Sequence, residues 1–179
     1  PVLIDLDFRY PIEKGMERIS SIDSIITFLE KYLEITSTFL EIENEKKVCF
    51  VMEKSKPVKD ESKNIMKDGV HIILPYIVSK YNPLFLTRLE ILKEKNIIDI
   101  FKNLGFTNSI DDIVDEAVIK RNNWFMYGSS KPGKERYNIT SILKFDKEKG
   151  KLINTGTETG LKNIDLVKLL SVNDFLEEH

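Results

Sequence analysis

Short apolar runs of strand length alternate along this chain with longer segments whose apolar residues recur at helical spacing. From Ser21 these residues follow the three-four spacing of one helix face, and Ser20 or Ser21 can cap that helix. One or two further helices are expected within residues 83–105, ending at Gly105. Strands interleaved with helices predict an α/β (α+β) sandwich with a mixed sheet.

The expected strands are short and rich in β-branched or aromatic residues. They cover residues 2–10, 47–53, 69–76, 112–119 and 123–128, and a further strand lies within residues 136–145. Residues 54–67 are polar, lysine-rich and contain a proline, so we expect a mobile loop there. A last amphipathic segment covers residues 164–172.

Length and composition limit the classes to which the chain can belong. Its 179 residues suffice for one well-buried core, and its hydrophobic fraction of 41% and charged fraction of 31% are typical of a globular domain. The longest apolar stretch is far shorter than the roughly 18 residues of a membrane-spanning helix, so we expect no membrane partner. Because the first residue is Pro rather than Met, we expect residues 1–179 to be a single domain from a longer protein.

Cysteine content and net charge indicate the redox setting of the protein and the way in which it could bind nucleic acid. Cys49 is the only cysteine, which excludes a disulfide framework and a Cys-based zinc site within the chain. We therefore expect an intracellular, reducing setting. The net charge of −2 provides no overall attraction for nucleic acid, so such binding would depend on local basic clusters. Residues 120–121 and 131–136 form the two candidate clusters.

Gly128, Gly133 and Lys134 have the spacing of a nucleotide-binding P-loop. A working P-loop needs a Ser or Thr directly after the lysine and a helix that starts there, so that its amides face phosphate. Glu135 occupies the hydroxyl position, and the residues after it alternate as in a strand. We therefore interpret this stretch as a loop between two strands, with an ATPase P-loop as the alternative.

Asp5 and Asp7 lie two residues apart on the first expected strand. Successive side chains of a strand point to opposite faces, so the two carboxylates share one face while Leu6 and Phe8 can share the core side. Two carboxylates roughly 7 Å apart along a strand suit a pair of divalent ions about 3.5 to 4 Å apart. The alternative is a solvated strand edge, although the apolar residues before Asp5 favour a central strand.

His71 is the only histidine apart from the terminal His179. It shares a strand face with Gly69 and, if the strand extends far enough, with Lys67. An imidazole N–H beside an ammonium, with a glycine that permits close approach, suits an anionic group such as a triphosphate. The alternative is a half-buried strand histidine that binds no ligand.

A third acidic position, Asp115, follows an apolar residue and precedes the basic and aromatic stretch that leads to the glycine-containing loop. A third carboxylate would add to a metal site formed by the two acids of the first strand. Asp111, Asp112 and Glu116 compete with Asp115 for this role, and spacing does not separate them.

The order of these stretches is more informative than any one of them. The sequences DLDFR, KDGVHI and NNWFMYGSSKPGK, in this order, resemble the three-motif catalytic core of the archaeo-eukaryotic primase superfamily, the primase-polymerases. The likeness is strongest to the primase domain of the primase-helicases of large DNA viruses, and it spans residues 2–140. The resemblance implies a mixed-sheet catalytic core with an RRM-like unit and flanking helices.

The resemblance also implies roles for the matching residues. It implies that Asp5, Asp7 and Asp115 are catalytic and hold two Mg²⁺ or Mn²⁺ ions. It implies that His71, together with Lys67 and Gly69, contacts the phosphates of the incoming nucleotide and takes part in catalysis. The other residues implied in the nucleotide pocket are Arg121, Asn123, Ser130 and Lys131. Many members carry a serine where this chain has Gly69, so only the backbone would serve at that position.

The activity implied by the resemblance is DNA-dependent synthesis of RNA or DNA primers from nucleoside triphosphates during DNA replication. The implied partners are a single-stranded DNA template and a helicase domain in the same full-length chain, at a viral replication site in a host cell. A repair or translesion polymerase on the same core and a catalytically silent nucleic-acid-binding module are the alternatives. A glycosyltransferase with a D-x-D motif would not explain the later motifs.

Overall fold

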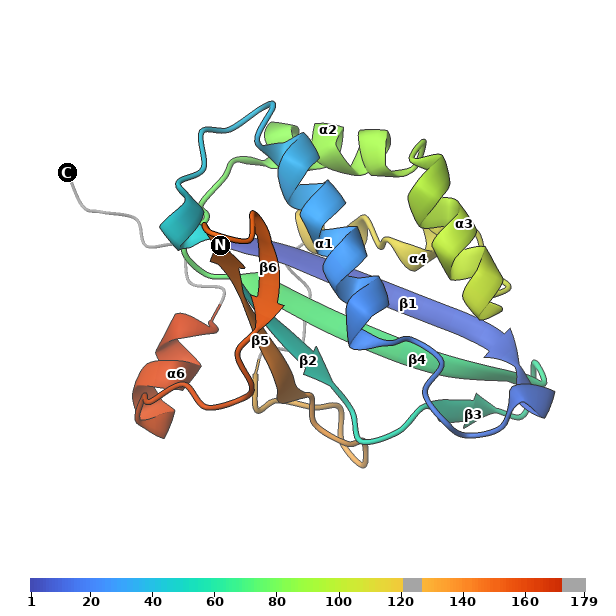
Figure 1. The fold of residues 1–179 in the computed structure, drawn as a ribbon. Helices are drawn as coiled ribbons and strands as arrows, with labels where there is room; N and C mark the ends of the chain where they lie inside the picture. The colour runs from blue at the N-terminus through green and yellow to red at the C-terminus, as the bar shows by residue number, and fades with distance from the viewer. Residues whose placement is uncertain (121–126, 172–179) are drawn as a thin grey trace.

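The computed structural model describes residues 1–120 and 127–171, which form one sheet with helices packed against it (Figure 1). The strands are β1 (Val2–Pro11), β2 (Val48–Glu53), β3 (Val58–Asp60), β4 (Ile65–Leu74), β5 (Asn138–Asp146) and β6 (Lys151–Asn154). The α-helices are α1 (Ile22–Thr36), α2 (Tyr81–Ile91), α3 (Lys95–Leu104), α4 (Ile110–Ile113), α5 (Ala117–Lys120) and α6 (Asn163–Leu169). Within these residues the strand order is β1-β4-β2-β5-β6, and β3 pairs with β4.

The predicted α+β class is confirmed, but the expected mixture of strand directions is not observed. Every pairing between the described strands is antiparallel. The helix predicted from Ser21 is α1, and the Ser21 hydroxyl accepts a hydrogen bond from the Ser24 amide. α3 is followed by Gly105 in the left-handed conformation (φ 97°), which is the predicted helix end.

Residues 112–119 do not form the predicted strand. They contain the end of α4, a single bridge between Val114 and Leu6, and α5. The Ser109 hydroxyl accepts a hydrogen bond from the Asp112 amide at the start of α4. The Asp115 carboxylate accepts one from the Ala117 amide at the start of α5. These side-chain caps stabilise short helices where the β-branched residues alone favour a strand.

Two other segments also differ from the prediction. Residues 54–67, expected as a mobile loop, contain β3 and the start of β4, and an ion pair of 2.8 Å joins Asp60 to Lys67. β6 was not predicted, and it pairs with β5 after a turn in which Gly150 has φ 63°. Most of the strand predicted at 123–128 lies outside the described residues.

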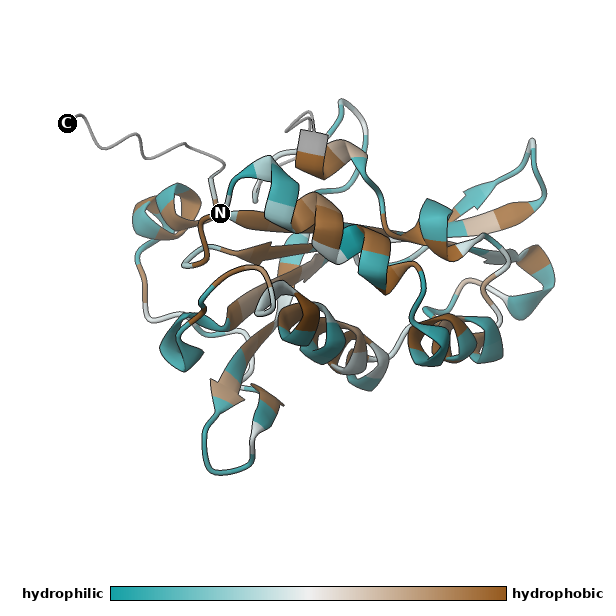
Figure 2. Cartoon of the chain, turned by 90° about the horizontal axis from the view of Figure 1, so that it is seen from above, coloured by the Kyte–Doolittle hydropathy of each residue, from teal (hydrophilic) through white to brown (hydrophobic). Residues whose placement is uncertain are grey.

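The two faces of the sheet carry different cores. On one face Leu6 and Phe8 of β1 are fully buried with Phe28 of α1, in a core that also includes residues of α2 and α3. On the other face a smaller core includes Leu166 of α6 and Leu170. Figure 2 shows hydrophobic residues along the strands and on one side of the helices, with hydrophilic residues in many of the connecting loops. The first face is therefore closed by helices, whereas the described residues cover the second face only in part.

Cys49 belongs to the larger core, where burial raises the pKa of its thiol to about 12. A thiol in these surroundings packs as a small apolar side chain and is not a reactive nucleophile. Across residues 1–120 and 127–171, no helix is long and apolar enough to cross a membrane.

Candidate active site

β1 and β4 bring the first two sequence motifs together. Their antiparallel register places Asp5 opposite His71 and Asp7 opposite Gly69. Residues opposite each other in such a pair project to the same face, which here is the face away from Leu6 and the α1 core. His71 Nε2 lies 3.6 Å from Asp5 Oδ1. The D-x-D and G-x-H motifs therefore lie side by side on the second face of the sheet, opposite the α1 core.

A cleft of about 530 Å³ opens over these two motifs. The residues predicted for the site that line it are Asp5, Asp7, Lys67, Gly69, His71, Ser130 and Lys131. Lys54, Lys56 and Lys134 also line it and add positive charge. A concave site that combines carboxylates with lysines suits a polyanion bound together with divalent cations.

Asp115 lies beside β1 through a short bridge, although it is not among the residues that line the cleft. Val114 pairs with Leu6, and the Asp115 amide donates a 3.0 Å hydrogen bond to the Asp5 carbonyl. Buried Arg88 of α2 holds this segment, because its Nε donates to the Val114 carbonyl at 2.7 Å. Asp111, a competitor in the sequence, is instead paired with Arg88 at 2.8 Å. The geometry thus distinguishes Asp115 from its acidic neighbours as the acid beside β1.

The surroundings of Asp5 disfavour its charged form. Burial, followed by the nearby Asp115 and Asp7 carboxylates in that order, raises its pKa from 3.8 to about 7. Its side chain is 20% exposed, so the carboxylate is still accessible from the cleft. Such a perturbed acid in a cleft is typical of a functional site rather than of a solvated strand edge.

The raised pKa of Asp5 predicts a pH-dependent stability in protein freed of metal by EDTA. Because the folded state holds this proton more tightly than the unfolded chain does, the stabilisation is present at low pH and is lost as the pH rises through about 7. Urea unfolding at pH 5 and pH 8 should therefore show a loss of stability for the wild type that Asp5→Asn lacks. Equal pH dependence in the two proteins would show that Asp5 titrates normally.

The acids of the site offer ligand atoms of the kind that a divalent metal requires. Carboxylate oxygens are ligands that Mg²⁺ and Mn²⁺ prefer, and a cation would offset the burial and the carboxylate repulsion that raise the pKa of Asp5. Among the described residues, no three His, Cys, Asp or Glu side chains are close enough to form a metal site together. Asp115 Oδ1 accepts a 2.8 Å hydrogen bond from the Ala117 amide. Asp5 and Asp7 therefore fit a cation from their shared strand face, whereas Asp115 has one of its two carboxylate oxygens engaged in its cap.

Tyr137, directly before β5, is a cleft residue that the sequence analysis placed in a strand but assigned no role. Its ring stacks on His71 with centroids 3.6 Å apart and planes 12° apart. Burial raises the pKa of its hydroxyl, with further contributions from Asp5, Asp68 and Asp7, so the hydroxyl stays protonated. A Cβ atom on Gly69 would lie 2.5 Å from this hydroxyl oxygen. The lack of a side chain at Gly69 therefore leaves space for the Tyr137 hydroxyl as well as for any ligand.

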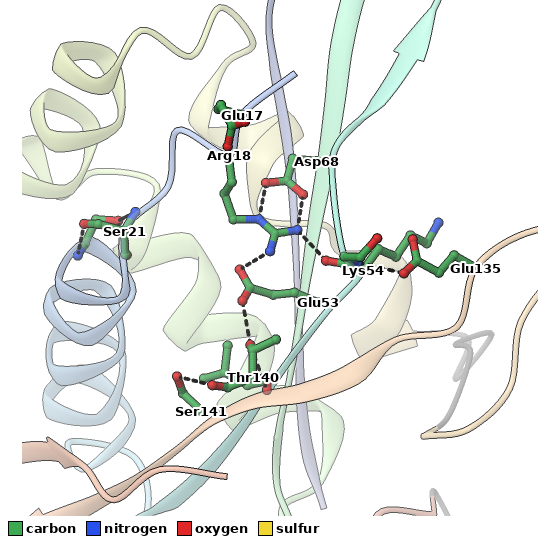
Figure 3. Close-up of polar contacts among 12 residues, drawn as sticks. Glu17, Arg18, Ser21, Glu53, Lys54, Asp68, Glu135, Thr140 and Ser141 are labelled. Atoms are coloured by element: carbon green, nitrogen blue, oxygen red, sulfur yellow. Dashed lines mark hydrogen bonds and ion pairs between the residues drawn. The ribbon is translucent and has the colours of Figure 1, made fainter. Parts of the chain in front are cut away.

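Arg18, in the segment between β1 and α1, links residues of β2 and β4 beside the cleft (Figure 3). Its guanidinium donates to both carboxylate oxygens of buried Asp68 of β4, at 2.7 and 2.8 Å. It also donates to the Lys54 carbonyl at 3.0 Å and lies 3.3 Å from Glu53 of β2. Glu53 in turn accepts a hydrogen bond from Thr140 of β5. This network fixes the start of the β2–β3 loop, and only the folded arrangement identifies its members.

The β2–β3 loop forms one wall of the cleft and the segment 128–136 forms another. The Ser55 amide donates a 2.9 Å hydrogen bond to Glu135, which joins the two walls. Lys54 Nζ lies 5.1 Å from the centroid of the Tyr137 ring. One sequence signal points to this wall, namely the lysine-rich composition of residues 54–67.

The structure also bears on the P-loop alternative. The Lys134 amide bonds to the Lys131 carbonyl in a turn, and β5 begins at Asn138 without an intervening helix. A P-loop requires a helix that begins at the lysine, so this interpretation is not supported. Lys134 is exposed and also lines the cleft. Arg121 and Asn123, both predicted for the nucleotide pocket, lie outside the described residues.

Comparison with known proteins gives two matches. A family model described as “C962R protein N-terminal AEP domain”, where AEP stands for archaeo-eukaryotic primase, matches residues 1–143. The chain is also 34% identical over 131 residues to the “Putative helicase L207/L206” of Acanthamoeba polyphaga mimivirus. This alignment covers 73% of the chain but only 13% of the relative, which is much longer.

Proposed function

Because the chain belongs to the family of archaeo-eukaryotic primase domains, we propose that it is a nucleotidyltransferase that synthesises primers on a single-stranded DNA template. The observation that carries this proposal is the register of β1 and β4, which pairs Asp5 with His71 and Asp7 with Gly69 in a lysine-lined cleft. The reaction is attack of a 3′-hydroxyl on a nucleoside triphosphate with release of pyrophosphate.

Each group of cleft residues has a distinct part in this proposal. Asp5, Asp7 and Asp115 would hold two divalent cations, Mg²⁺ or Mn²⁺, from the side of β1. When bound, such ions lower the pKa of an attacking hydroxyl and neutralise charge on the triphosphate and leaving group. His71 and Lys67 would orient the phosphates through charge-assisted hydrogen bonds. The pairing of β1 with β4 fixes the backbone positions of Asp5, Asp7 and His71 relative to one another, which would help to orient the reacting groups.

The setting is part of the same proposal. The mimivirus relative is described as a helicase, and the chain aligns with only 13% of it. We propose that the domain acts within a longer viral replication protein, in which a helicase opens the duplex and exposes the template.

An unprimed and a primed template separate primer synthesis from the other activities. The protein would be incubated with Mn²⁺, single-stranded DNA and labelled nucleotides, with and without an annealed primer. Products on both templates support a primase-polymerase. Products on the primed template alone would indicate a repair or translesion polymerase. Template binding without any product would indicate a silent binding module.

Lys131 and Lys134 both line the cleft, so their alanine variants can be compared directly. The family resemblance selects Lys131 as the phosphate contact, whereas Lys134 lies beyond the Pro132–Gly133 turn. We expect Lys131→Ala to weaken nucleotide binding and primer extension roughly tenfold or more. Lys134→Ala should have a small, salt-sensitive effect through the template. Nucleotide titrations and extension assays at two salt concentrations measure both. A larger loss in Lys134→Ala, together with template-independent ATP hydrolysis, would restore the P-loop interpretation.

A further inference from the structure

The side chain of Tyr137 lies close to three groups of the cleft, those of His71, Lys54 and Gly69. One face of its ring lies against His71, and the Lys54 ammonium lies 5.1 Å from the ring centroid. Its hydroxyl oxygen lies where a side chain on Gly69 would begin, 2.5 Å from the ideal Cβ position. Tyr137, directly before β5, thus places side-chain atoms beside a position of β4 that has no side chain.

The hydroxyl lies among the groups proposed to bind phosphate. Gly69 is opposite Asp7 in the register and two residues from His71, and all three line the cleft with Tyr137. Within residues 1–120 and 127–171, no protein group forms a hydrogen bond with this hydroxyl. A polar group in a cleft, without a protein partner and beside lysines, is suited to donate to a bound anion.

We propose that Tyr137 is a nucleotide-contact residue, whose hydroxyl donates a hydrogen bond to a phosphate oxygen of the bound triphosphate. Its ring has a second role, because stacking on His71 holds the imidazole in the orientation that faces Asp5. This inference rests on the proposed nucleotidyltransferase function and adds a residue that comes from a third strand segment. It also gives a reason for Gly69, since any larger residue would displace the tyrosine.

The geometry permits a hydroxyl on residue 69 in place of the hydroxyl on residue 137. Without the Tyr137 hydroxyl, the nearest ring atom to a Cβ on Gly69 is Cζ at 3.6 Å, an ordinary van der Waals distance. Gly69→Ser alone should push the ring from His71 and weaken nucleotide binding. Tyr137→Phe alone should keep the stacking and weaken binding roughly tenfold, as expected for a lost hydrogen bond to a charged group. The double variant Gly69→Ser/Tyr137→Phe should bind more tightly than either single variant.

The experiment measures dissociation constants for ATP and dATP with Mn²⁺, by calorimetry, and melting temperatures for the same proteins. Gly69→Ala/Tyr137→Phe is the control for the double variant, because it fills the same space without a hydroxyl. Tyr76→Phe removes a hydroxyl from an exposed tyrosine outside the cleft lining and should change nothing.

The outcomes separate this inference from the function on which it rests. Tighter binding by the serine double variant than by the alanine double variant supports the inference. If the wild type binds both nucleotides and Tyr137→Phe binds them equally well, the hydroxyl contact is refuted and the proposed function stands. If the wild type binds neither nucleotide, the proposed function fails and takes the inference with it.

Discussion

Replacement of Asp5 or Asp7 by asparagine is expected to abolish nucleotide transfer without destabilising the protein. Asparagine keeps the shape of the side chain but removes the charge that would bind a divalent cation. At Asp5 the change also removes a buried carboxylate whose pKa is raised to about 7, so the melting temperature should stay equal or rise. At Asp7 the lost ion pair with Arg9 is solvent-exposed, and such pairs contribute little.

Transfer is measured as incorporation of labelled nucleotide, and Mn²⁺ binding is measured in the same variants by titration. Asp99→Asn, on the exposed side of α3, is the matched control and should behave as the wild type. Wild-type incorporation by both the Asp5 and Asp7 variants would show that these carboxylates have no part in the reaction.

His71→Ala is expected to raise the KM for the nucleotide by the equivalent of about 1.5 to 3 kcal/mol, which is roughly a 10- to 150-fold change. The physical reason is loss of a charge-assisted contact with the phosphates. Because His71 is only 5% exposed and stacks on Tyr137, the alanine variant should also melt at a lower temperature.

Ile72→Ala separates these two effects, because Ile72 is the next residue on β4, is fully buried and belongs to the core on the opposite face. It should lower the melting temperature and leave the KM of the folded protein unchanged. His71→Asn, which retains a polar side chain, should recover part of the stability but not the KM. A wild-type KM in His71→Ala would make His71 a core residue only.

The period of a strand explains why part of the site was predictable. Alternation along β1 predicted that Asp5 and Asp7 share a face and that Leu6 and Phe8 face the core, and both of these apolar residues are fully buried. A period of two fixes the face of every residue once the strand exists. The sequence pattern therefore predicts which side chains of one strand share a face, which is the local part of the site geometry.

The contacts between distant segments were not predictable from such patterns. The register that places Asp5 opposite His71 depends on strand pairing, and a shift of one residue would turn one motif to the other face. Tyr137 and Arg18 act through partners far away in the chain, which no local signal reveals. The error at residues 112–119 has a different cause. There the β-branched composition indicated a strand, whereas caps from Ser109 and Asp115 begin two short helices.

The most direct test of the central claim, template-directed nucleotide transfer in this cleft, is the identity of the nucleotide incorporated opposite each template base. Four primed single-stranded templates that differ at one position would be offered each labelled nucleotide with Mn²⁺, for the wild type and for Asp7→Asn. We predict that the wild type adds the complementary nucleotide in each case and that Asp7→Asn adds none. Incorporation that ignores the template base, or that persists unchanged in Asp7→Asn, would contradict the account.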